Sequence, residues 1–318
     1  MKRFLLLAII IFISHIDSHE FNPAHLIVNE VDTNLNEYEI TWMYPYKNIG
    51  QRGIVVFPEF CNSDINDPYI EGKYLVDNYL ITCEESLRGA SIEFYNLSVL
   101  TDALITINFY DQDIFESLVN NKNNIVKVPL NNNYLPIAYL NLGISHLFTG
   151  IDHILFILGL IFLVKGALNI VKTITAFTIA HSITLAFSVL GYLSLPQSTV
   201  EALIALTIIY LAIEIISKKK RLTFTPWSLA FGFGLLHGMG FAGVLREIGI
   251  GEGQIIPSLL FFNIGIEVGQ LMLIPVFIFI IYFGKKYNFY NYFVNTASFF
   301  LGIMGFYWFI DRSIEILI

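Results

Sequence analysis

The chain has 318 residues, of which 55% are hydrophobic and 14% charged, with a formal net charge of −8 at pH 7. Its mean hydropathy of +0.63 is too high for an ordinary soluble globular protein, so we expect an integral membrane protein surrounded by a lipid bilayer. Most acidic residues lie in the first half, which lacks the mixture of aromatic and basic residues typical of nucleic-acid binding, and nucleic acid is therefore excluded as a partner.

The N-terminal residues have the layout of a secretory signal peptide. In MKRFLLLAIIIFISHIDSHE, two cations precede an apolar stretch of roughly ten residues and a more polar exit. We expect cleavage after Ser18, which makes residues 1–18 the signal peptide. An uncleaved anchor is the alternative, because no small-x-small cleavage site is evident. The chain that follows is expected to lie outside the cytoplasm.

Residues 19–135 have the period-two alternation of short β-strands. The alternating segments are YEITWMY, GIVVFPEF, YLITCEE, ASIEFYNL, ALITINFY and NIVKVPL, separated by stretches rich in Asn, Asp, Gly and Pro. This spacing predicts an extracytoplasmic all-β domain resembling an antiparallel sandwich. Its two cysteines are Cys61 and Cys83, and a compartment that tolerates disulfides favours a bridge between them over two buried free thiols.

Apolar runs of membrane-spanning length begin after residue 135. Over residues 136–318 we expect a polytopic α-helical bundle of about six spans, at 139–164, 173–193, 199–217, 226–245, 255–283 and 293–310. Eight Lys and Arg residues flank these spans on one side and two on the other, which makes the first side cytoplasmic. The N-terminal domain and the C-terminus then lie outside, as the signal peptide requires, and the expected location is the bacterial inner membrane.

Ionisable and polar side chains lie at a common depth in these spans. Such groups are costly in a bilayer, usually face the interior of a bundle and mark an ion or substrate path. Four of the seven histidines fall in this layer, which predicts a shared metal or proton site. The candidate ligands are His146, His153, His181, His237 and Glu267. The groups expected to hold ligands in place or to act as a general base are Asp152, Ser182, Asn263 and Gln270.

Helical spacing indicates how the groups of the first span are directed. His146 and His153 are seven residues apart and would share one face of a continuous helix. Asp152 would point about 100° away from His153. We therefore expect Asp152 to accept a hydrogen bond from a neighbouring ligand or to face another helix.

A metal permease is one function that this set of residues would support. Imidazole and carboxylate ligands suit Ni²⁺, Co²⁺, Zn²⁺ or Cu²⁺, and the absence of cysteine from the spans argues against Cu(I). A permease would capture the ion at His146 and His153, pass it to His181 and His237, and hold it loosely enough for release. The expected inward path is a polar stripe on the third span, formed by Thr207, Tyr210 and Glu214.

Two other functions use the same residues differently. A zinc-dependent hydrolase acting on a lipid or lipid-linked substrate would use Glu267 or Asp152 as general base, with Ser182 orienting the substrate. A structural metal site would hold the bundle together while the β domain acts as the binding module. The route through the membrane and the number of filled coordination positions distinguish these functions.

Five motifs of the membrane part resemble the HupE/UreJ family. In chain order they are HLFTGIDHILF, FTIAHSITL, EALIALTIIYLAIE, GFGLLHGMGFA and FNIGIEVGQ, and the first matches the H-x5-D-H pattern of the family. The resemblance is to the branch with an exported N-terminal domain, and it implies a nickel or cobalt permease. An acidic residue follows the corresponding His-Gly in the permeases, where this chain has Met239. The last two motifs contain Gly234-x3-Gly238 and Gly265-x3-Gly269, spacings that let helices approach closely.

Overall fold

A computed structural model gives the structure of this chain. It describes residues 22–33, 35–46, 52–64, 67–98, 101–130, 136–217, 225–243, 245 and 254–317. The expected signal peptide, the basic residues at 218–221 and Arg246 lie outside these ranges. The chain consists of two compact units, one that contains the β-strands and one that contains most of the helical residues.

Ten strands form two sheets in the described part of the β-rich unit. The order in the larger sheet is β4 (Cys61–Asp64), β6 (Tyr74–Cys83), β2 (Glu37–Pro45), β1 (Ala24–Asp32), β8 (Ala103–Asn108) and β9 (Ile114–Val119), and β5 (Tyr69–Glu71) also pairs with β6. The order in the smaller sheet is β10 (Ile125–Lys127), β7 (Ser91–Tyr95) and β3 (Ile54–Val56). Both sheets contribute to one buried core, in which the Trp42 and Phe94 ring centroids lie 5.8 Å apart.

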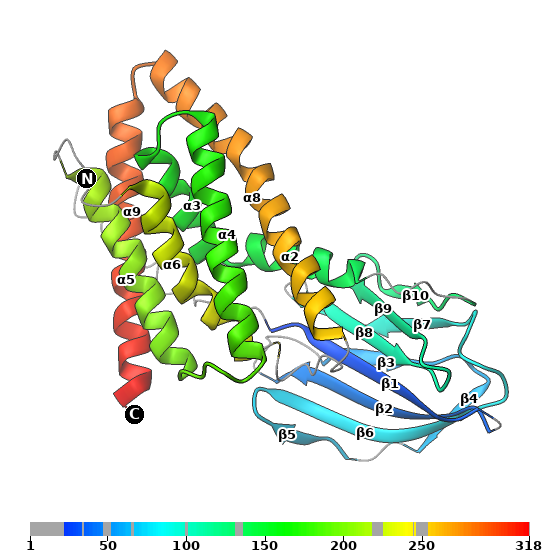
Figure 1. Cartoon of the computed structure of the whole chain (residues 1–318). Helices are drawn as coiled ribbons and strands as arrows, with labels where there is room; N and C mark the ends of the chain where they lie inside the picture. The colour runs from blue at the N-terminus through cyan, green and yellow to red at the C-terminus, as the bar shows by residue number, and fades with distance from the viewer. Residues whose placement is uncertain are drawn as a thin grey trace. The chain divides into compact units, whose positions relative to one another are not determined.

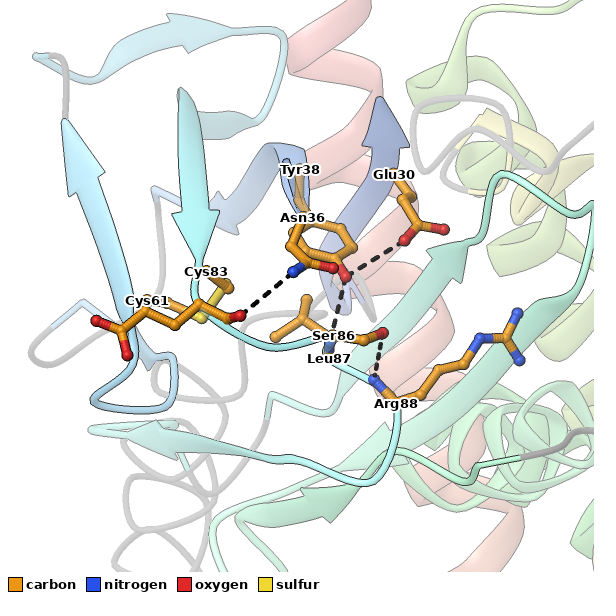
Figure 2. Close-up of a disulfide and its surroundings, with 9 residues drawn as sticks. Glu30, Asn36, Tyr38, Cys61, Cys83, Ser86, Leu87 and Arg88 are labelled. Carbon is orange, nitrogen blue, oxygen red and sulfur yellow. Dashed lines mark hydrogen bonds between the residues drawn. A yellow bond between two sulfur atoms is a disulfide. The ribbon is translucent and has the colours of Figure 1, made fainter. Parts of the chain in front are cut away.

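The disulfide joins two neighbouring strands of the larger sheet. Cys61 on β4 and Cys83 on β6 are directly paired in the strand register and are linked by their sulfur atoms. Figure 2 shows the disulfide beside Tyr38, whose hydroxyl accepts a hydrogen bond from the Leu87 backbone N–H at 3.1 Å. The bridge and this buried hydrogen bond both fix the segment that follows β6.

The alternating segments located most of the strands, but two aspects of the sheet were not anticipated. The strands β1, β4, β5 and β9 were not among the predicted segments, and β1 pairs with β8 in parallel rather than antiparallel. Inward and outward side chains alternate in both kinds of pairing, so the sequence pattern does not distinguish them. Among the described strands, all other neighbouring pairs are antiparallel.

Seven helices have their bounds within the described residues. They are α2 (Ile137–Thr149), α3 (Ile151–Leu163), α4 (Ala167–Val189), α5 (Gln197–Ile216), α6 (Pro226–Gly240), α8 (Ile255–Lys286) and α9 (Tyr290–Leu317). Four of them, α4, α5, α8 and α9, are long and apolar enough to cross a membrane, and the bent pair of α2 and α3 makes up to five spans. The helix in the fourth expected span, α6, ends at Gly240 and has 15 residues, which is short for a bilayer.

The helices of the bundle pack in two close pairs, α4 with α6 and α5 with α9 (Figure 1). Glycines permit the first pair, because a Cβ atom on Gly234 would overlap the Phe177 carbonyl oxygen and one on Gly238 would overlap that of His181. Helix α3 lies against both pairs through apolar clusters that contain Phe156 and Leu155. The Gly234-x3-Gly238 spacing therefore brings α6 against α4 at the level of His181.

The first expected span, 139–164, is a broken helix and not a continuous one. Helices α2 and α3 meet at Gly150 with a bend of 72°. Gly150 has an extended conformation. The Thr149 hydroxyl donates a hydrogen bond to the Ser145 carbonyl oxygen at 2.8 Å, a kind of contact that weakens and bends a helix. Glycine is a poor helix former, and Asp152 in the first turn of α3 complements the new helix N-terminus.

Candidate metal centre

Four buried histidines come together in the bundle from four helices. His146 lies in the last turn of α2, His153 in the first turn of α3, His181 in the middle of α4 and His237 in the last turn of α6. Their exposed fractions are 8%, 5%, 0% and 2%. Buried histidines at this depth are costly unless their ring nitrogens are satisfied by other groups.

The distances between these rings are those of one cluster. One ring nitrogen from each of His146, His153 and His181 lies within 4.8 Å of the others. The ring centroid of His153 is 4.8 Å from that of His146 and 5.3 Å from that of His237. Imidazole nitrogens bound to one zinc ion lie about 2.1 Å from the metal and hence roughly 3.4 Å apart, so the triad is slightly wider than a closed coordination sphere.

Three of the histidines use the Nδ1 atom to contact an oxygen acceptor. The contacts are His153 Nδ1 to Asp152 Oδ1 at 3.2 Å, His181 Nδ1 to Asn263 Oδ1 at 3.1 Å and His237 Nδ1 to the Phe233 carbonyl oxygen at 3.0 Å. A carboxylate, an amide oxygen and a backbone carbonyl all accept hydrogen bonds, so each Nδ1 must carry the proton and donate. In a neutral imidazole this leaves the lone pair on Nε2.

The Nε2 atoms of the same three histidines are buried and have no hydrogen-bond partner among the described residues. An oxygen acceptor on Nδ1 orients most metal-binding histidines and raises the basicity of the other nitrogen. Three buried lone pairs without donors are therefore arranged as ligands for a cation. The chemistry of the site therefore fits a metal ion, and nickel, cobalt and zinc are all compatible with imidazole ligands.

Aromatic side chains surround the histidines and keep the site apolar. The ring centroids of Phe156 and Phe177 lie 5.2 and 5.1 Å from that of His237. The Phe241 ring lies 4.3 Å from that of His146 and stacks on Phe262 at 5.0 Å. Electrostatic interactions are stronger where water is excluded. These four aromatic residues were not among the predicted site residues, although each lies within four residues of a candidate polar residue or in a histidine motif.

The structure separates the residues that support the cluster from those that do not contact it. Asp152 and Asn263 each accept a hydrogen bond from a histidine. The Ser182 hydroxyl donates to the Thr178 carbonyl oxygen of its own helix at 2.7 Å. Glu267 and Gln270 instead accept hydrogen bonds from two threonines of α4 that were not among the predicted site residues, Thr175 and Thr178.

The stripe expected on the third span lies on α5. The Thr207 hydroxyl donates to the Ile204 carbonyl oxygen of its own helix at 2.6 Å, and Thr207 is buried. The Tyr210 ring packs edge-on against Phe233, with the centroids 5.8 Å apart. Glu214 lies one helical turn further along, toward the C-terminal end of α5.

The fold and the histidine cluster define a class of protein: a multi-pass membrane protein with a buried polyhistidine site suited to a divalent metal. The family model described as HupE / UreJ protein matches residues 122–312, and the chain belongs to this family. This membership relates the chain to nickel and cobalt transport at a membrane. Neither the curated proteins nor the solved structures contain a match to the chain.

Proposed function

We propose that the protein is a permease for a divalent transition-metal ion, nickel or cobalt, and that the four histidines bind the transported ion. The observation that carries this proposal is the uniform pattern at His153, His181 and His237. Each donates from Nδ1 to an oxygen and leaves a buried Nε2 without a hydrogen-bond partner among the described residues. If these histidines only packed in the bundle interior, their three buried Nε2 lone pairs would be expected to accept hydrogen bonds.

Transport requires binding that is firm but reversible. A site with imidazole nitrogens spread to 4.8 Å must contract to hold an ion fully, and this contraction lowers the net affinity. In our proposal His146 and His153 receive the ion and His181 and His237 take it further into the bundle. Release follows because binding is weak enough for the ion to leave toward a second site.

The proposed topology is that of an inner-membrane protein of bacteria. Residues 1–18 are the signal peptide, 19–135 an extracytoplasmic β-sandwich domain and 136–318 a membrane domain of six spans, counting α6 and the bent pair as one span each. The positive-inside rule then leaves the β domain and the C-terminus on the extracytoplasmic side. The core shared by the two sheets supports the sandwich, and the described helices support the membrane domain.

The same geometry gives less support to a hydrolase. A general base must reach a water at the metal, yet Asp152 accepts a hydrogen bond from His153, and the hydrogen bond of Glu267 is with Thr175 and not with a histidine. A structural metal site is the other alternative, and it differs from a permease in one measurable respect: the ion would be bound but not transported.

The proposal is tested by metal binding and by uptake with the same variants. We expect the purified full-length protein to bind nickel or cobalt in equilibrium dialysis, with the metal measured by mass spectrometry. His153→Ala and His237→Ala should each lose most bound metal, because each removes an imidazole ligand. Cells that express these variants should accumulate correspondingly less nickel or cobalt.

A histidine of the β-rich unit provides the matched control. His25 is fully buried and its Nε2 atom contacts the Thr106 hydroxyl at 2.9 Å. His25→Gln should retain metal binding, since the residue has no part in the cluster. Full metal occupancy in both His153→Ala and His237→Ala would contradict the proposal, and normal occupancy without any uptake by the wild type would favour a structural site.

A further inference from the structure

Three hydrogen bonds between side chains join one face of α4 to one face of α8. The donors on α4 are spaced by three residues and the acceptors on α8 by four and three, so each set lies on one face of its helix. The bonds, which together we call the α4–α8 seam, are His181 to Asn263 (3.1 Å), Thr178 to Gln270 (2.9 Å) and Thr175 to Glu267 (2.6 Å).

The α4–α8 seam begins at the histidine cluster and extends away from it. With a rise of 1.5 Å per residue, Thr178 lies about 4.5 Å and Thr175 about 9 Å along α4 from His181. This direction leads toward the N-terminal end of α4 and toward the Lys285 and Lys286 end of α8. By the distribution of basic residues, that end of the bundle is the cytoplasmic one.

The α4 donor farthest from His181, Thr175, pairs with a carboxylate of α8 that has unused capacity. Glu267 Oε1 accepts the Thr175 hydroxyl, whereas Oε2 is buried and has no hydrogen-bond partner among the described residues. Gln270, one turn away, is only 1% exposed. An ionised carboxylate at this depth is costly without a compensating charge, so a cation beside Glu267 would be strongly stabilised.

The ligand types change along the α4–α8 seam. The histidine cluster offers imidazole nitrogens, and the seam beyond His181 offers the oxygens of Thr178, Gln270, Thr175 and Glu267. First-row transition metals such as nickel and cobalt favour imidazole, while all-oxygen sites suit harder ions. An ion that moves from the cluster to Glu267 would therefore pass from a firmer to a looser site, which is the order that release requires.

The polar stripe on α5 is the competing route. Its first member, Thr207, directs its hydroxyl to the carbonyl oxygen of Ile204 on the same helix. Its second member, Tyr210, packs on Phe233. In contrast, the α4–α8 seam includes His181, a member of the cluster, through its bond to Asn263.

We propose that the α4–α8 seam is the exit path of the transported ion and that Glu267 is its carboxylate binding site below the histidine cluster. This inference rests on the proposed metal transport. It separates Glu267 from the histidine ligands: the histidines determine whether the protein binds the ion, and Glu267 determines whether the bound ion leaves.

The test compares metal binding and transport in Glu267→Gln. We expect the purified full-length variant to bind nickel at the histidines with the wild-type stoichiometry, while the initial rate of nickel uptake in cells falls at least tenfold. Glu267→Asp keeps the carboxylate and should recover part of the uptake. The matched control is Glu315→Gln, which changes an exposed carboxylate of α9 that bonds to Arg312 at 2.7 Å and should leave binding and uptake unchanged.

Three outcomes would overturn the inference. Wild-type uptake by Glu267→Gln would remove Glu267 from the path. Loss of bound nickel in Glu267→Gln, with the protein still folded, would make Glu267 a ligand of the histidine cluster itself. Reduced uptake in Glu214→Gln beside normal uptake in Glu267→Gln would move the path to α5. A wild-type protein that binds no metal would instead contradict the proposed function, and the exit path with it.

Discussion

Replacement of Asp152 tests whether the Nδ1 contacts prepare the histidines for metal. Asp152 Oδ1 lies 3.2 Å from His153 Nδ1, longer than the roughly 2.7–2.9 Å of a strong charge-assisted hydrogen bond. Loss of an acceptor behind a metal-binding histidine typically lowers metal affinity 10- to 100-fold. We expect Asp152→Asn, which keeps an oxygen acceptor, to weaken nickel binding about tenfold, and Asp152→Leu, which removes it, to approach 100-fold. These ratios correspond to about 1.4 and 2.7 kcal/mol.

The assay is competition between the detergent-solubilised protein and a metallochromic chelator. The visible spectrum of bound Co²⁺ reports whether the ligand set itself has changed, and it should be retained in Asp152→Asn because all four imidazoles remain. Asp311→Asn, near the C-terminal end of α9, is the control for loss of one negative charge, since Asp311 is partly exposed and lies near Arg312. An unchanged dissociation constant for Asp152→Leu would refute the role of the contact in orienting His153.

Three further predictions concern the bundle, the disulfide and the topology. Gly238→Ala should destabilise the protein by about 1–3 kcal/mol in thermal unfolding, because its Cβ would overlap the His181 carbonyl oxygen, whereas Gly232→Ala on the same helix meets no atom within 4 Å and should be tolerated. Alkylation of the denatured, non-reduced protein should label neither Cys61 nor Cys83, and labelling of both would exclude the bridge. A tag at the C-terminus should be accessible from outside the inner membrane, and a cytoplasmic tag would refute six spans.

The sequence predicted those parts of the fold that depend on local periodicity. Alternating segments such as YEITWMY became β2, and the long apolar runs became α4, α5, α8 and α9. The sequence did not predict which strands pair when they lie far apart in the chain. The parallel alignment of β1 with β8 joins residues about 80 positions apart, as the bond between Asn29 and Asn108 illustrates. No local pattern encodes such a partner.

The part of the candidate site that the sequence predicted is the part that follows from the depth of each residue in its span. The histidines were selected because they lie at one level of their spans, and the structure brings the four rings into one cluster. Depth does not determine direction around a helix. Ser182, one residue after His181, therefore bonds to its own backbone, and Glu267 bonds to Thr175 instead of the histidines.

The break at Gly150 explains why His146 and His153 can act on one ion. On a continuous helix, two residues seven apart share a face but are separated by about 10.5 Å along the axis, too far for both to reach a single metal. The 72° bend brings their ring centroids to 4.8 Å. A Cβ atom on residue 150 would lie 2.7 Å from His153 Nδ1 and 3.1 Å from Asp152 Oδ1, so the break also needs glycine. The break at Gly150 therefore interrupts the helix at the position where an unbroken helix would keep His146 and His153 apart.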